Sequence, residues 1–196
     1  MHQIILASQS PRRKQLLELA QIPCTVKVAN VEEIYPETLA PREVPVYLAQ
    51  LKAQAIWSSL STIEKETAVI IASDTVVVAN GTILGKPQDR LEAIRTIQSL
   101  SGQIHQVITG VHICGQDFSE DIYEVVEVHF RPLSSEEIEH YVDHFKPYDK
   151  AGSYAIQEWI GAIGIEKING DYYAVMGLPI SAVYQTLKKH QINYSF

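Results

Sequence analysis

Cysteine is scarce in this chain, and long apolar runs are missing. The two cysteines among its 196 residues, Cys24 and Cys114, lie far apart and form no C-x-x-C pair. We therefore predict two buried free thiols in a reducing compartment. No run approaches the roughly 18 apolar residues of a membrane-spanning helix, and the first residues lack the basic and apolar regions of a secretory signal. These absences predict a cytoplasmic protein with no membrane partner.

Basic residues are also fewer than acidic ones. The chain has 16 lysines and arginines against 23 aspartates and glutamates, which gives a formal net charge of −7 at pH 7. Such a charge repels nucleic acid over most of the surface, so we expect no nucleic-acid partner. An anionic ligand must then be held by a local cluster of basic side chains.

Several familiar catalytic motifs are absent as well. The sequence has neither a G-x-G-x-x-G nor a G-x-S-x-G motif. Residues 81–86 superficially resemble a P-loop, but the spacing is one residue short and Pro87 replaces the required serine or threonine. His140 and His144 are four residues apart, yet no glutamate follows His140 as it does in zinc hydrolases. We predict that the two histidines lie on a solvated helix face.

What is present is the composition of an ordinary folded protein. Apolar residues make up 46% of the chain and charged residues 20%, and neither repeats nor a linker divides it, so we expect one domain over residues 1–196. Strands are expected at 4–7, 24–28, 68–79, 82–84, 104–113 and 122–130, with a strand–turn–strand unit at 162–176. Helices are expected at 11–20, 46–59, 89–100, 134–145 and 181–190. This mixture predicts a mixed α/β sheet with helices packed on it.

The turn that starts at Ser8 is the first candidate site. Ser10 is a good N-cap and Pro11 suits the first helical position, because its missing N–H would have no partner there. The free N–H groups and the positive end of the helix dipole then face the turn. The polar side chains available there are Ser8, Ser10, Arg12 and Arg13. This stretch predicts a phosphate site; the alternative is a capped surface helix with two solvated arginines.

Two acids form the second candidate site. Asp74 lies inside an apolar, β-branched strand, where a carboxylate is costly unless it is paired, bound to a metal or placed at a cavity. Glu33, from an acidic loop, is a candidate partner. Two carboxylates can hold Mg²⁺, or either can take a proton from an attacking water. The alternatives are an Asp74 carboxylate tied to backbone N–H groups or to a lysine, and a solvated loop in which Glu33 and Glu32 are equivalent.

Lys52 and Lys86 complete the set of charged candidates. Lys86 lies in a turn between Gly85 and Pro87, where a side chain can project into a cleft, and Lys52 lies on an expected helix. Taken alone, each is more often a surface lysine whose apolar stem lies along the protein. Together with the arginines and the two acids, these lysines are the side chains needed to bind a metal–polyphosphate substrate and to promote in-line attack by water.

An ordered set of short motifs gives the chain a family resemblance. In order they are S-Q-S-P-R-R at 8–13, Glu33, K-A at 52–53, A-S-D-T-V-V at 72–77, G-K-P at 85–87, L-S-G at 100–102, T-G-V at 109–111, D-K-A-G-S-Y-A-I-Q at 149–157 and G-L-P at 177–179. Over essentially its whole length the chain resembles the Maf family of nucleoside triphosphate pyrophosphatases. The resemblance implies an inosine triphosphatase-like α/β fold, with an elongated mixed sheet flanked by helices and a cleft between two lobes.

The resemblance also implies an activity and a role for each matching residue. The family hydrolyses nucleoside triphosphates between the α- and β-phosphates and needs a divalent cation, Mg²⁺ or Mn²⁺. Asp74 matches the family's general base, and Glu33, Lys52 and Lys86 match the polar cluster that supports this base. Asp74 and Glu33 are also the candidate ligands of the metal ion. The residues that match positions setting substrate choice are Arg12, Thr75 and Gln157.

The segment around Gln157 resembles the branch of the family that acts on dTTP and UTP. A glutamine amide can donate to O4 and accept from N3–H of uracil or thymine, although a flipped amide would serve adenine or cytosine. We therefore expect a dTTP and UTP pyrophosphatase that cleans the nucleotide pool. The alternatives are a pyrophosphatase for another nucleotide and a nucleotide-binding regulator of cell division. The sequence leaves the oligomeric state open, and a homodimer is compatible with it.

Overall fold

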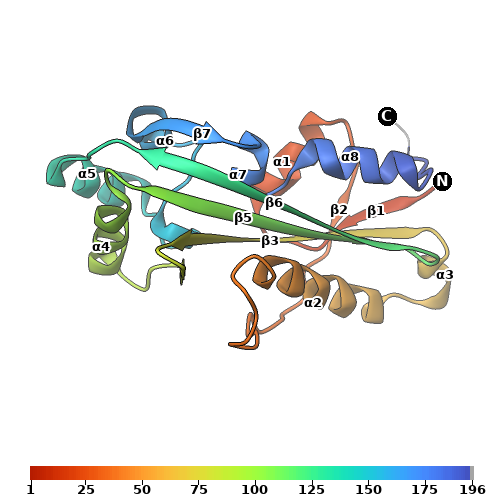
Figure 1. Ribbon diagram of the computed structural model, residues 1–196. Coiled ribbons are helices and arrows are strands. Elements are labelled where there is room, and N and C mark those ends of the chain that lie inside the picture. Colours follow the sequence, from red (N-terminus) through yellow and green to blue (C-terminus); the bar gives the residue numbers. More distant parts are fainter. Residues whose placement is uncertain (195–196) are drawn as a thin grey trace.

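The computed structural model, described here for residues 1–194, is a long twisted sheet with helices on both faces (Figure 1). The sheet has the strand order β2-β1-β3-β5-β6-β7, and β4 pairs with β3. The strands are β1 (Gln3–Leu6), β2 (Thr25–Val26), β3 (Ala68–Ala79), β4 (Thr82–Leu84), β5 (Ile104–Cys114), β6 (Ser119–Phe130) and β7 (Ile165–Asn169). Because β1 is parallel to β3 whereas β5 and β6 are antiparallel to their neighbours, the expected mixed sheet is confirmed.

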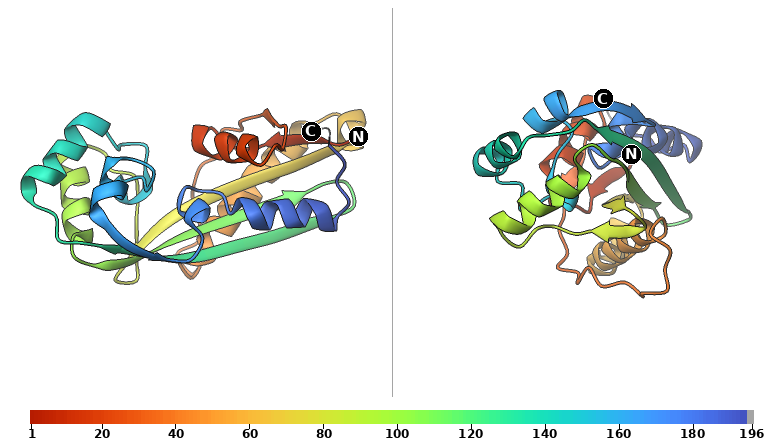
Figure 2. Two further views of the ribbon diagram at one scale, coloured as in Figure 1. Left: turned by 90° about the horizontal axis from the view of Figure 1, so that it is seen from above. Right: turned by 60° about the vertical axis from the view of Figure 1, so that its left-hand side comes forward.

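Helices gather at the two ends of the sheet. They are α1 (Pro11–Leu19), α2 (Val44–Ser59), α3 (Thr62–Lys65), α4 (Arg90–Leu100), α5 (Ser135–Phe145), α6 (Trp159–Gly164), α7 (Tyr172–Val175) and α8 (Ile180–Lys189), with a 3₁₀ turn η1 (Ala151–Ser153). We call the end with α1 and α8 the first lobe, and the end with α4, α5 and α6 the second lobe (Figure 2). We infer one domain, because β3, β5 and β6 run through both lobes.

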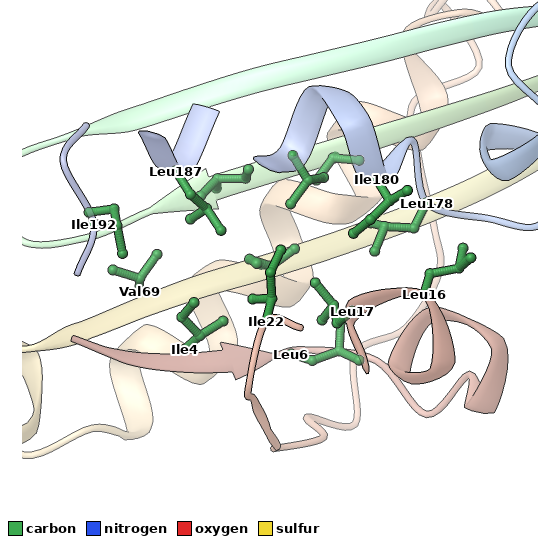
Figure 3. Packing of buried hydrophobic residues seen from close by; sticks show 14 residues of the cluster. Ile4, Leu6, Leu16, Leu17, Ile22, Val69, Leu178, Ile180, Leu187 and Ile192 are labelled. Carbon is green, nitrogen blue, oxygen red and sulfur yellow. The ribbon is translucent and has the colours of Figure 1, made fainter. Parts of the chain in front are cut away.

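Residues of β3 alternate between two cores, as period-2 alternation in a strand requires. In the first lobe, Val69 and Ile71 pack on one face with α1 and α8, through side chains such as Leu17 and Leu187 (Figure 3). On the other face, Ile70 packs with the small side chains of α2. Helix and sheet approach very closely there. A Cβ at Gly110 of β5 would lie 2.4 Å from the Val46 backbone nitrogen of α2.

A polar belt separates the first-lobe core from the core of the second lobe. Val77 and Val107 belong to the second core, which α4 and α5 cover. Between the two cores, on the face away from α2, lie Ser73, Thr75 and Thr109, which form this belt. The hydroxyls of Thr75 and Thr109 are 2.8 Å apart and hydrogen-bonded. The sheet is therefore continuous, whereas its apolar core on this face is interrupted.

Most of the expected elements are confirmed, but one expected strand is wrong. The unit at 162–176 has its first strand, β7, whereas residues 172–175 form the short helix α7. Asn169-Gly170 predicted a hairpin, but the Asp171 side chain accepts a hydrogen bond from the Tyr173 N–H and so begins a helix. β2 is also shorter than expected, at two residues.

The structure can be compared with three smaller predictions, which concern the two cysteines, membrane-spanning helices and the histidine pair. Both thiols are free, but Cys24 and Cys114 are half-buried rather than fully buried. Among the described residues, no helix is long and apolar enough to cross a membrane. His140 and His144 are exposed on α5, as expected.

Candidate active site

A gap at the edge of β3 creates a pocket. β1 pairs with β3 only as far as Leu6 and Ile71, and β4 begins to pair with β3 at Val77. In between, no strand of residues 1–194 lies beside this edge of β3, because the chain leaves the sheet after β1 to form the turn into α1. The three polar residues of β3, at positions 73–75, fall in this gap. The pocket beside them measures about 440 Å³.

Every site residue expected from the sequence lines this one pocket. They come from the turn before α1, α1 itself, the loop after β2, α2, β3, the turn after β4 and the segment before α6. They are Ser8, Ser10, Arg12, Arg13, Glu33, Lys52, Asp74, Thr75, Lys86 and Gln157. Residues up to 149 positions apart thus meet at one place.

Two lysines and two carboxylates alternate at one end of the pocket. Lys52 Nζ lies 2.5 Å from Asp74 Oδ1 and 2.8 Å from Glu33 Oε1, and Lys86 Nζ lies 3.0 Å from Glu33 Oε2. Burial alone would raise the pKa of Glu33, but the hydrogen bonds and charges of the two lysines outweigh it and lower this pKa to about 2. Glu33, rather than its neighbour Glu32, makes these contacts, which the sequence left open.

Arg13 is bonded to protein groups along its whole guanidinium. Nε donates to the Gly177 carbonyl at 2.8 Å, Nη1 to Ser8 Oγ at 3.0 Å and Nη2 to Thr75 Oγ1 at 3.1 Å. Burial lowers the pKa of Arg13, and the charge of Asp74 opposes this. Arg13 therefore ties α1 to the polar belt and to the loop before α8, and each of its three guanidinium nitrogens already donates to a protein group.

Arg12 makes fewer contacts with the protein than Arg13 does. Its side chain is 25% exposed, and the nearest acidic group in the described chain is Asp149, with 4.0 Å between Nη1 and Oδ2. Its donors are thus available to a ligand in the pocket. Ser10 stands at the N-cap position of α1, but its side chain makes no capping bond, which corrects the expected cap. Its own N–H instead donates to Ser8 Oγ at 3.2 Å.

The other end of the pocket is mainly apolar. It is built largely by the second lobe and the segment between η1 and α6. The apolar side chains that line it are Val77, Val107, Ala151, Tyr154, Ala155, Ile156, Val175 and Met176. Gln157 is exposed beside them, and within residues 1–194 its amide has no hydrogen-bond partner. The pocket therefore offers the ion pairs of Lys52 and Lys86 at one end. At the other it offers the free amide of Gln157 among mainly apolar side chains, with the Lys150–Asp149 ion pair also in the lining.

Sequence reasoning missed a buried lysine in this pocket. Lys150 is only 7% exposed, and its Nζ lies 2.8 Å from Asp149 Oδ1 and 3.3 Å from Glu158 Oε1. Burial alone would raise the pKa of Asp149, but its hydrogen bond to Lys150 lowers this pKa. The sequence shows a glycine within this polar run, and the structure shows why it is there: Gly152 has a φ of +66°, and a Cβ there would lie 2.8 Å from Val77, so the run at 149–153 packs closely against β3.

This geometry defines a class of protein. Free or exposed cations at one end suit phosphate oxygens, and a buried carboxylate beside them can orient or deprotonate a water. Apolar walls with one amide suit a flat polar ring. The pocket is that of an α/β protein for a small molecule that combines anionic groups with such a ring.

Comparisons with known proteins identify the family. The Maf-like protein family matches residues 3–190, and the chain belongs to it, as its motifs predicted. The dTTP/UTP pyrophosphatase of Cytophaga hutchinsonii is 47% identical over 95% of this chain and 83% of that protein. The protein of the same name from Christiangramia forsetii is 45% identical over 96% of this chain and 94% of its own length. Among solved structures, the Ham1 protein of Staphylococcus aureus is 15% identical with a TM-score of 0.46, over 65% of this chain and 71% of that one.

Proposed function

We propose that this protein hydrolyses dTTP and UTP between the α- and β-phosphates, releasing dTMP or UMP and pyrophosphate. The supporting observation is that one pocket is lined both by the ion-paired Lys52, Glu33 and Lys86 and by a mainly apolar segment that carries Gln157. Relatives at 45–47% identity carry the name dTTP/UTP pyrophosphatase. The reaction suits removal of unwanted nucleotides from the cytoplasmic pool.

Asp74 is the proposed general base. Its carboxylate takes a proton from a water aimed at Pα; the new bond joins that oxygen to Pα, and the bond from Pα to the bridging oxygen breaks. Lys52 Nζ donates to Asp74 Oδ1 at 2.5 Å and so holds this carboxylate at the wall of the pocket. Lys52, Lys86 and Arg12 neutralise charge on the phosphates and on the departing pyrophosphate.

A divalent cation fits the acids of this pocket only together with the substrate. Among residues 1–194, no group of three or more ligating side chains could hold a metal ion by itself. Mg²⁺, however, is commonly bound by one or two carboxylates plus substrate phosphates, and Glu33 and Asp74 offer two carboxylates on either side of Lys52. These two residues would hold Mg²⁺ or Mn²⁺, which would supply further charge neutralisation.

Gln157 is the proposed selector of the base. Its amide can donate to O4 and accept from N3–H of uracil or thymine, and it has no protein partner that would compete within the described chain. Apolar neighbours such as Ile156 and Met176 offer a surface on which the ring of the base can pack. A base with the wrong pattern of donors would then leave buried polar groups unpaired, which is a strong source of discrimination.

The test is a nucleotide panel. The purified protein is incubated with Mg²⁺ and each common nucleoside and deoxynucleoside triphosphate, and pyrophosphate and orthophosphate are quantified separately. We expect pyrophosphate together with UMP or dTMP, and little product from purines. Release of orthophosphate would overturn the assigned bond, and preference for purines would overturn the role of Gln157.

A further inference from the structure

The selector Gln157 is followed by a glutamate that points away from the pocket. Glu158 hydrogen-bonds the hydroxyl of Tyr141, a fully buried residue of α5. The same hydroxyl accepts a hydrogen bond from the Ala155 N–H at 3.2 Å. One phenol therefore holds both ends of the 155–158 turn. Gln157 lies inside this turn.

The turn is closed by further contacts on the same side. The Glu158 N–H donates to the Ala155 carbonyl at 3.1 Å. A Cβ at Gly161, in the first turn of α6, would lie 1.8 Å from the Ile156 carbonyl oxygen. Helix α6 thus begins directly against this turn, which leaves the turn little room to shift.

An ion pair also holds the Glu158 carboxylate. Its Oε1 lies 3.3 Å from Nζ of the buried Lys150, while its Oε2 accepts from Tyr141. Burial and the neighbouring carboxylate raise the pKa of Tyr141, so its hydroxyl stays protonated and keeps donating. The carboxylate is thereby held between α5 and the pocket wall.

We propose that Tyr141 and Glu158 are positioning residues that set base selectivity by holding the Gln157 amide in place. This rests on the proposed function of Gln157. Neither side chain is among those that line the pocket, so they act through the turn. Loss of the brace lets the backbone that carries Gln157 shift, so the amide no longer meets O4 and N3–H of uracil at one fixed place, and the preference for uracil over cytosine falls.

The experiment compares Tyr141→Phe with the wild-type protein, using UTP and CTP as substrates. The substitution removes one hydroxyl and keeps the ring in its core. We expect the KM for UTP to rise roughly tenfold, the kcat to change less than about threefold, and the UTP/CTP selectivity to fall about tenfold, because the lost hydroxyl bonds both the Glu158 carboxylate and the Ala155 N–H. Glu158→Gln, which keeps the shape of the side chain, should have a smaller effect in the same direction.

A matched control separates positioning from general loosening of the second lobe. Ser101 Oγ accepts a hydrogen bond from the Leu133 N–H at 2.7 Å, away from the pocket. Ser101→Ala also deprives one backbone N–H of its partner, and should lower stability without changing selectivity. In a Gln157→Ala background, Tyr141→Phe should have no further effect on selectivity, because the group that it positions is gone.

The outcomes distinguish the brace from the proposed function. A wild-type enzyme that does not prefer UTP overturns the function assigned to Gln157. A selective wild-type enzyme whose UTP/CTP ratio is unchanged by Tyr141→Phe overturns the brace alone. Equal loss of selectivity in Ser101→Ala, or full additivity of Tyr141→Phe with Gln157→Ala, also overturns it.

Discussion

The two ends of the pocket are held in place by different means. At the ionic end, Glu33 and Lys86 have side chains 42% and 54% exposed, and their positions are set by ion pairs with one another. At the apolar end, the turn that carries Gln157 is fixed from behind by the fully buried Tyr141. A charged cluster can rearrange around a ligand at little cost, whereas a turn bonded to the core cannot.

The different ways of holding the two ends suit the two parts of a nucleotide, its phosphates and its base. Phosphates and a cation must enter and leave the ionic end in each cycle, so mutual pairing that a ligand can replace is an advantage there. Discrimination between bases requires a donor and an acceptor at fixed positions. Damage to the ionic end should therefore slow every nucleotide alike, and damage to the apolar end should change which nucleotide is preferred.

The largest expected effect is at Asp74. Asp74→Asn should lower kcat by about 10²- to 10⁴-fold for every nucleotide, because the amide cannot accept the proton of the attacking water. The UTP/CTP ratio should stay as it is. Steady-state kinetics with both substrates measure this, and Asp121→Asn, which changes an exposed aspartate of β6, is the matched control. Near-wild-type turnover would remove Asp74 from the role of base.

Substitution of Lys52 tests whether the ion pairs among the charged side chains control activity at the ionic end. Lys52→Met removes the cation between Asp74 and Glu33, and we expect kcat to fall about 10²-fold. The pKa of Glu33, now about 2, should rise, because loss of a neighbouring cation disfavours a carboxylate. The acid limb of the profile of kcat/KM against pH should therefore move to higher pH. An unchanged acid limb would show that the pair does not control activity.

Gln157→Ala should have a moderate effect confined to selectivity. The kcat/KM for UTP should fall roughly 10- to 100-fold, and that for CTP should change little, since only the pairing with uracil is lost. Competition assays with both nucleotides in one reaction give the ratio directly. An equal loss for the two substrates would contradict the division between the ends.

Arg13 should show the smallest effect on chemistry and a clear effect on stability. Arg13→Lys replaces a planar fork by one ammonium group, which cannot reach Gly177, Ser8 and Thr75 together. We expect a loss of about 2–3 kcal/mol in the free energy of unfolding, measured with denaturant. Arg42→Lys, on an exposed arginine, should be within about 0.5 kcal/mol of wild type. A Michaelis constant that rises without loss of stability would instead make Arg13 a phosphate contact.

Local structure was largely predictable from the sequence. The β-branched run from 68 to 79 forms β3, and Asn80-Gly81, with φ values of 50° and 76°, makes the expected turn into β4. Asp89 and Ser134 cap helices as expected. The failure at 172–175 has a local cause, because Asp171 is a helix N-cap and outweighs the hairpin signal of Asn169-Gly170.

By itself the sequence determined which chemical groups the pocket holds, because residue types and their order in short motifs are properties of the chain. The tertiary structure decided which groups are free. Arg12 and Arg13 are neighbours and look equivalent, yet Arg13 is bonded to a carbonyl 164 residues away and Arg12 remains available. Glu33 and Glu32 are likewise separated only by the reach of two lysines, and Glu158 gains its partner only when α5 packs behind the turn. Such partners are set by long-range packing, which no local pattern encodes.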